Sequence, residues 1–162
     1  MSKEIFFPDT QFIISKTDTK GKITYGNELF VQISGYQSQE LINKPHSILR
    51  HKDMPKVIFK KLWETIEGSQ ELFAYVKNKT KQGDYYWVLA FVTPSYDENG
   101  KLIEYFSVRR IPNKEVINEV IIPLYTKLLS LEKEGGINAS EKFLNNLLQE
   151  KGLTYEQFIF SV

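Results

Sequence analysis

The sequence predicts an α+β fold: a five-stranded antiparallel sheet with short helices over one face, followed by a C-terminal helical extension. Residues 12–109 contain five runs rich in β-branched and aromatic residues, separated by Gly-, Asn- and Asp-containing turns. Three short helical patterns lie between the second and third runs, and only helical periodicity follows residue 112. Two strands, a helical excursion and three further strands fit one sheet, with a cleft between the sheet and the helices.

Turn residues delimit the expected strands. Gly21 supplies a permissive backbone between the first two, and Asn99-Gly100 favours the positive φ of a tight turn between the last two. Pro94 is expected to end the fourth strand. The five expected strands are 12–17, 23–25, 72–78, 85–93 and 103–109.

The fourth strand is apolar on both faces. One face carries Tyr86, Val88, Ala90 and Val92, and the other carries Tyr85, Trp87, Leu89 and Phe91. Both faces must therefore be covered. The short helices cover one, and the C-terminal helices, the N-terminal segment or a partner subunit covers the other.

Capping signals place the helices of the excursion. Asn27 caps a helix that runs to Ser34, and a second helix spans 38–42. Asp53 is an N-cap candidate, followed by Pro55 in the first turn, for a longer helix that ends at Gly68.

The C-terminal extension carries a broad apolar stripe between Val116 and Leu131. Pro123 is expected to kink this helix and Gly135-Gly136 to break it. Asn138-Ala-Ser-Glu141 resembles a capping box for the next helix, and Thr154 starts a last one. We expect an N-terminal segment (1–11), a sensor domain (12–111) and a helical extension (112–162).

Composition excludes several classes of function. The 162 residues carry a net charge of +1, which gives no field for nucleic acid or acidic membranes. No cysteine is present, so disulfides and thiol catalysis are excluded. No leader or run of about 20 apolar residues appears, so we expect a cytoplasmic protein without membrane insertion. No serine elbow or phosphate loop is present, so we expect no enzymatic activity.

Several short motifs of the sequence resemble one group of PAS domains. They are Asn27-Glu-Leu-Phe30, Ile33-Ser-Gly-Tyr36, Pro45-His46, Arg50-His51-Lys-Asp53-Met-Pro-Lys56, Val76-Lys-Asn78, Lys81-Gln-Gly-Asp84, Tyr86-Trp-Val88 and Ser107-Val-Arg109. From about Thr17 to Arg109, the chain resembles flavin-binding PAS domains of the aerotaxis (Aer) and energy-taxis (CetB) type. One departure is Phe73, which stands where that group often has Trp.

The resemblance implies a PAS fold, non-covalently bound FAD and a redox or energy-taxis signal. It also implies a split receptor, in which this chain signals to a separate membrane transducer. That transducer is methyl-accepting, HAMP-containing and CetA-like, and it recruits the chain to the membrane. The C-terminal helices either pack on the second sheet face or dock to the transducer or to another copy, forming a homodimer.

Nine residues are candidates for holding the cofactor: Asn27, His46, Arg50, His51, Asp53, Trp63, Asn78, Tyr86 and Ser107. A cationic Arg50 and His51 suit a pyrophosphate or a reduced flavin, and Asp53 orients them or only caps its helix. The Asn78 amide matches the N3–H and carbonyl edge of a flavin, or caps a turn.

The other candidates also have structural readings. Asn27 contacts the ligand or caps its helix, Trp63 walls the cleft or packs in the core, and Ser107 bonds the flavin N5 region or has no such role. Tyr86 and Trp87 point to opposite faces, and we favour Tyr86 for the cleft.

Two other functions stay open at this stage. The first is a PAS interaction module with haem, another ligand or none, and His51 is then the candidate haem ligand. The second is a flavoenzyme, although the sequence has no glycine fingerprint for a nicotinamide cofactor. Two histidines without cysteine predict no structural metal site.

Overall fold

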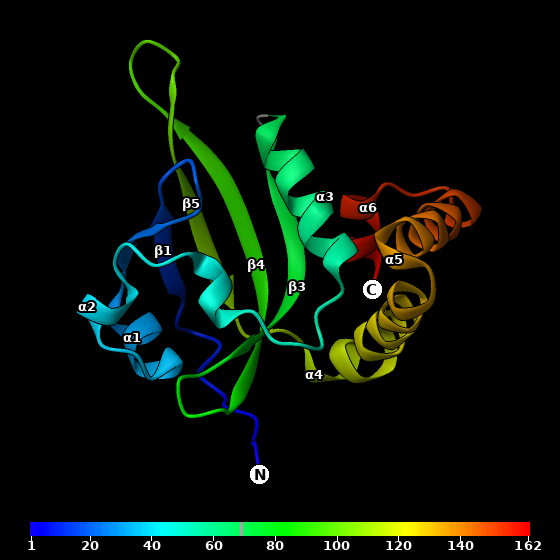
Figure 1. The fold of residues 1–162 in the computed structure, drawn as a ribbon, viewed down its shortest axis with the longest axis horizontal. Helices are drawn as coiled ribbons and strands as arrows, with labels where there is room; N and C mark the ends of the chain where they lie inside the picture. The colour runs from blue at the N-terminus through cyan, green and yellow to red at the C-terminus, as the bar shows by residue number, and fades with distance from the viewer. Residues whose placement is uncertain (69) are drawn as a thin grey trace.

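The computed structural model describes residues 1–68 and 70–162. Its centre is one antiparallel sheet of five strands in the order β2-β1-β5-β4-β3 (Figure 1). The strands are β1 (Ile13–Thr17), β2 (Ile23–Gly26), β3 (Leu72–Lys79), β4 (Tyr85–Tyr96) and β5 (Leu102–Arg110). The predicted α+β fold class and the predicted order of elements are confirmed.

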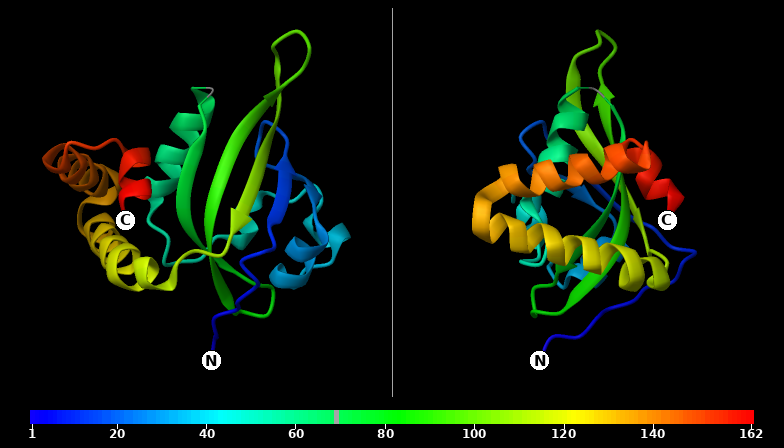
Figure 2. Two further views of the ribbon diagram at one scale, coloured as in Figure 1. Left: turned by 180° about the vertical axis from the view of Figure 1, so that it is seen from behind. Right: turned by 90° about the vertical axis from the view of Figure 1, so that its right-hand side faces the viewer.

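Short helices lie over one face of the sheet, and the C-terminal helices lie beside β3 and α3 (Figures 1 and 2). The first group is α1 (Glu28–Ser34), α2 (Ser38–Leu41), the 3₁₀ helix η1 (His46–Leu49) and α3 (Lys56–Glu67). The second group is α4 (Lys114–Val116), the π-helical turn η2 (Ile117–Ile121), α5 (Ile122–Lys151) and α6 (Tyr155–Ser161).

β4 is longer than predicted, because Pro94 does not end it. β3 pairs with β4 only as far as Val92, whereas β5 pairs with it as far as Tyr96. Pro94 therefore has a strand neighbour on one side only, the edge-like setting in which a strand tolerates proline.

The C-terminal extension packs on the part of the second sheet face that β3 and β4 form. The Tyr125 hydroxyl donates a hydrogen bond to the Tyr75 carbonyl at 2.6 Å, and the rings of Trp87 and Tyr125 lie 6.1 Å apart. Ile121 and Leu128 of the extension are fully buried in the same core. Of the three predicted covers for this face, the extension therefore packs on β3 and β4, and Ile5 and Phe6 of the N-terminal segment line a hollow with Trp87.

The extension turns back on itself at Gly136. Its φ of 73° and ψ of −169° interrupt the regular geometry of α5, so that two helical arms meet there (Figure 2). Glycine tolerates this backbone because it has no Cβ. The predicted break is confirmed. The π-helical turn η2 lies directly before Pro123, which falls in the first turn of α5.

The N-cap prediction for Asp53 is wrong. Pro55 occupies the N-cap position of α3, and the carboxylate of Glu132 on α5 accepts hydrogen bonds from the backbone N–H groups of Lys56 (2.8 Å) and Val57 (3.1 Å). Since the helix begins only at Lys56, Asp53 lies too far upstream to cap it. A carboxylate 76 positions away along the chain supplies the cap.

Two side chains of the second arm, Ser140 and Glu141, add to this contact. Ser140 donates to Glu132 at 2.8 Å, and Lys60 on α3 forms a salt bridge with Glu141 at 2.8 Å. Glu141 therefore binds α3, and we find no capping-box bond from Asn138 in the described part of the chain. α3 is tied to both arms of the extension.

We expect Glu132→Ala to lower the free energy of unfolding by about 1–2 kcal/mol, because two backbone donors of α3 lose their acceptor. Urea denaturation measures it. Glu134→Ala is the control, since this exposed carboxylate lies two positions away on the same arm. Equal stability of the two variants would contradict a capping role for Glu132.

Candidate functional site

A cleft of about 340 Å³ lies between α3, η1 and the sheet. Its volume falls in the range of small-molecule sites. Its apolar and aromatic walls are Pro45, Phe59, Leu62, Trp63, Ile66, Val76, Ala90, Val92 and Tyr105. Its polar lining is Thr17, Lys20, His46, Ser47, Arg50, Asn78, Ser107 and Arg109, and Gly21 completes it.

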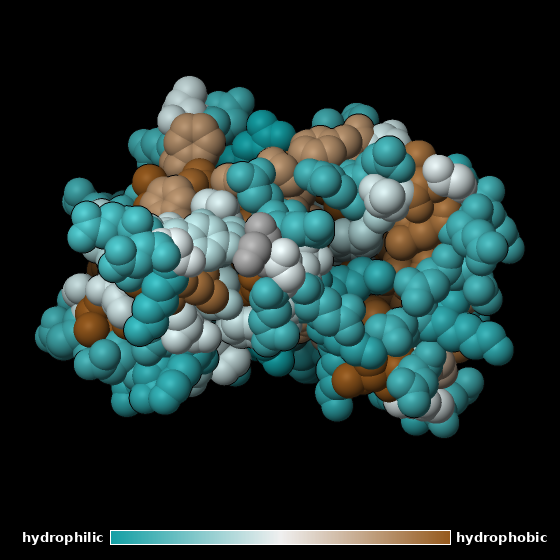
Figure 3. Space-filling view, turned by 90° about the horizontal axis from the view of Figure 1, so that it is seen from above, coloured by the Kyte–Doolittle hydropathy of each residue, from teal (hydrophilic) through white to brown (hydrophobic). Residues whose placement is uncertain are grey.

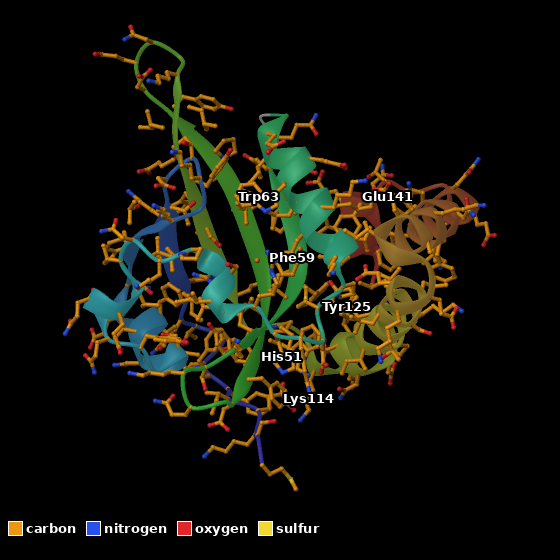
Figure 4. The ribbon with its side chains drawn as sticks, viewed as in Figure 1. His51, Phe59, Trp63, Lys114, Tyr125 and Glu141 are labelled. Atoms are coloured by element: carbon orange, nitrogen blue, oxygen red, sulfur yellow. The ribbon has the colours of Figure 1, made fainter. Side chains whose placement is uncertain are left out.

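Aromatic rings make the cleft suitable for a planar ligand. Phe59 and Trp63 come from α3 (Figure 4), and the Trp63 ring meets that of Tyr105 edge to face, with 5.9 Å between centroids. A Cβ on Gly21 would lie 3.3 Å from the Trp63 ring, so glycine lets the β1–β2 turn approach it closely. The guanidinium of Arg50 lies 3.8 Å from the centre of the Phe59 ring.

Three buried polar atoms at or beside the cleft have no hydrogen-bond partner among the described residues. One is Nε of Arg109, and the other two are Nδ2 of Asn78, which is 3% exposed, and the hydroxyl of Tyr86, which is fully buried. Asn78 and Tyr86 face each other across β3 and β4. Burial raises the pKa of Tyr86 to about 12, against smaller lowering effects of Arg109 and of the adjacent Asn78 amide, so the hydroxyl stays protonated. Because an unmade buried hydrogen bond costs about 1–3 kcal/mol, these groups favour a polar ligand.

Arg109 is a site residue that the sequence analysis did not select. It is 2% exposed, lines the cleft, and donates from Nη2 to the Ser15 hydroxyl at 2.6 Å. Its Nε has no partner in the described residues. The available signal was the alternation along β5, since Tyr105, Ser107 and Arg109 all line the cleft.

His46 is held in its neutral form. Burial and the positive charge of Arg109 lower the pKa of His46 to about 3. The ring stacks on Phe30 with centroids 6.0 Å apart, and its Nε2 lies 3.2 Å from Nη1 of Arg109. Arginine can only donate, so Nε2 accepts and the ring proton is on Nδ1.

Five of the nine predicted site residues line the cleft: His46, Arg50, Trp63, Asn78 and Ser107. Tyr86 is buried beside it, on the face opposite Trp87, which packs on Tyr125. Asn27, His51 and Asp53 do not line it.

Asn27 has a structural role in this fold. Its Oδ1 accepts from the backbone N–H groups of Phe30 and Ile14, both at 3.1 Å, and its Nδ2 donates to the Phe12 carbonyl at 2.9 Å. It caps α1, as its position predicted, and ties that helix to β1. Its amide is thereby engaged in the protein itself.

His51 and Asp53 form a separate cluster with Lys77. The Asp53 carboxylate lies 2.8 Å from the Lys77 ammonium, and Nδ1 of His51 accepts from the Asp53 backbone N–H at 3.0 Å. His51 lies at a distance from Phe59 and Trp63 in Figure 4. Burial, and then Lys77, lower the pKa of His51. Arg50 forms no salt bridge with Asp53 in the described residues.

Comparison with known proteins identifies the fold. The family described as PAS fold matches residues 23–109. This chain belongs to the PAS family. The matched PAS segment includes α3 and the strands that line the cleft.

Two related proteins match this PAS chain over most of its length. It is 42% identical to the aerotaxis receptor of Escherichia coli (strain K12) over 120 residues, which are 74% of this chain and 23% of the receptor. It is 30% identical to the nitrogen fixation regulatory protein of Klebsiella pneumoniae over 97 residues, 60% of this chain and 20% of that protein. The chain thus spans less than a quarter of either relative.

A solved light-oxygen-voltage domain, studied with a flavin analogue, has the same fold. It superimposes with a TM-score of 0.60 at 18% identity, over 72% of this chain and 87% of that domain. In the described residues of this PAS chain, no helix has the length and apolar character needed to span a bilayer. The same residues contain no cluster of three or more side chains suited to a metal ion.

Proposed function

We propose that this PAS domain binds FAD non-covalently in the cleft and acts as a redox sensor for energy taxis. The observation that carries the proposal is the pair of unpartnered, buried groups at the cleft, Nδ2 of Asn78 and Nε of Arg109. The aerotaxis receptor relative supports the taxis role, and the light-oxygen-voltage neighbour supports a flavin. The resemblance to aerotaxis PAS domains favours FAD over FMN.

The residues of the cleft fit a flavin. The amide of Asn78 can bond its N3–H and carbonyl edge, and the contacting rings of Trp63 and Tyr105 can form an aromatic wall beside a planar ring. Arg50, at the exposed side of the cleft, is suited to the negative phosphates. A bound flavin supplies reversible electron transfer, with changes in charge and protonation at N1 and N5.

α3 is the element best placed to pass the signal outward. Phe59 and Trp63 on α3 line the cleft, whereas Lys60 and the helix N-terminus bind the C-terminal extension through Glu141 and Glu132. A change of ring charge or hydrogen bonding that shifts α3 would also shift the extension. This is a local switch coupled to a second surface.

We propose that the receiver is a separate membrane transducer, methyl-accepting, HAMP-containing and CetA-like, which recruits this chain. Exposed apolar side chains are available for such contact, and hydrophobic patches are visible from above (Figure 3). The large exposed apolar residues include Phe12, Tyr25, Tyr96, Ile103, Ile122 and Phe160. A homodimer would use the same kind of surface.

The absorption spectrum of the purified protein, before and after dithionite, tests the cofactor. We expect a flavin spectrum that bleaches on reduction, with FAD released on heating. A Soret band would indicate haem, and no chromophore after incubation with FAD would favour an interaction module. Steady oxidation of NAD(P)H by the loaded protein would indicate a flavoenzyme instead.

We expect Asn78→Ala to weaken FAD binding by about tenfold to a hundredfold, because a buried hydrogen-bond partner of the ligand is lost. Fluorescence titration of the protein with FAD measures it. Lys79→Ala is the matched control, since this neighbouring side chain is exposed. Unchanged affinity in Asn78→Ala would contradict the assigned contact.

A further inference from the structure

All charged side chains that line the cleft are positive. Its charged lining residues are Lys20, Arg50 and Arg109, and no Asp or Glu is among the described residues that line it. Lys20 and Arg50 are exposed, so solvent screens their charges. Arg109 is 2% exposed, so its charge acts within the cleft with little screening by solvent.

The neighbours of Arg109 do not neutralise it. Within residues 1–68 and 70–162, no carboxylate forms a salt bridge with it. β1 contributes the Ser15 hydroxyl, η1 the neutral His46, and α1 the ring of Phe30, whose centre lies 4.6 Å from the guanidinium. From β4, the un-ionised Tyr86 lies in the same buried layer.

Protonation does not remove the charge near neutral pH. Burial lowers the pKa of Arg109 to about 10, which still leaves the guanidinium cationic at pH 7. A buried charge without a counter-charge is costly, and the low dielectric around it strengthens its attraction for any anion that enters. The unpartnered Nε marks a free donor at the same place.

We propose that Arg109 sets the charge preference of the cleft, so that a planar ligand is bound more tightly as an anion than in its neutral form. This inference rests on the proposed flavin function. There, two electrons from a reductant such as dithionite and one proton from solvent convert a neutral ring into an anionic one. Arg109 then favours reduction, because it binds the product of that step better than its precursor.

The test compares the reduction midpoint potential of bound FAD in the wild type and three variants, by dye-coupled titration. Arg109→Gln removes the charge and keeps hydrogen-bonding atoms, and Arg109→Lys keeps the charge. Arg110→Gln is the matched control, because it removes the same charge from the exposed neighbouring position. Circular dichroism and the affinity for oxidised FAD establish that each variant is folded and loaded.

We expect Arg109→Gln to weaken binding of reduced FAD about tenfold more than binding of oxidised FAD. For a two-electron couple, this is a shift of about 30 mV to more negative potential. Arg109→Lys should recover most of it, and Arg110→Gln should match the wild type.

Two negative outcomes are distinguishable. The role of Arg109 alone is overturned if flavin-loaded Arg109→Gln has the wild-type potential. It is also overturned if flavin-loaded Arg109→Lys shows the same shift in potential as Arg109→Gln. A wild-type protein that binds no flavin overturns the proposed function, and this inference with it.

Discussion

Replacing Ile121 by alanine is expected to lower the free energy of unfolding by about 2–5 kcal/mol. Ile121 is fully buried in the core that joins the extension to the sheet. Its truncation removes apolar contacts and leaves a cavity that neighbours fill only in part. Denaturation in urea, followed by tryptophan fluorescence and circular dichroism, measures the loss.

Ile122→Ala is the control for this prediction. The same residue type stands at the next position, at the same end of α5, but it is 40% exposed. We expect a change of less than about 1 kcal/mol, as for most surface substitutions. A loss of stability in Ile121→Ala that is as small as that in Ile122→Ala would mean that the extension is not held on the sheet in solution.

Acidification between pH 7 and pH 5 is the second large effect. A histidine whose folded pKa is about 3 stays neutral in the folded protein, whereas the unfolded chain binds a proton at His46 below about pH 6.5. Stability is therefore full above pH 6.5 and falls as the pH decreases, by up to about 1.4 kcal/mol per unit. At pH 5 the loss from His46 is up to about 2 kcal/mol.

His46→Gln should remove most of this pH dependence, because glutamine does not titrate. His51→Gln is the comparison, since the pKa of His51 is lowered less than that of His46, and its removal should therefore abolish a smaller part of the pH dependence. The carboxyl groups with lowered pKa, such as that of Asp18, titrate at lower pH and do not contribute in this window. Identical pH profiles for the wild type and His46→Gln would refute the neutral state of His46 in the folded protein.

Most of the fold was predictable from local signals. Runs of β-branched and aromatic residues bounded by turns identified all five strands, and the caps at Asn27 and Thr154 were placed correctly. The N-terminus of α3 was not predictable, because its acceptor, Glu132, is remote in the sequence. The full length of β4 also depends on where its neighbour β3 ends, which no property of Pro94 reveals.

The site was predictable in part. Strand alternation placed Asn78 and Tyr86 on the cleft side, as the structure has them. A motif shared within a family does not show which of its residues face the ligand. His51 and Asp53, for example, lie with Lys77 outside the cleft. Arg109 was missed because an arginine near a strand end resembles a solvated surface charge until its burial is known.

The strand order has a consequence for folding. The central pair of β1 with β5 joins residues about 90 positions apart, with Ser15 opposite Ser107. Closing so long a loop is slow, because its entropic cost comes before its contacts form. The hydrogen bond from Arg109 to Ser15 joins the same two strands. A nascent chain that has not yet emerged to Arg110 therefore lacks the part of the cleft that Tyr105, Ser107 and Arg109 form, and completion of the ligand site must follow synthesis of β5.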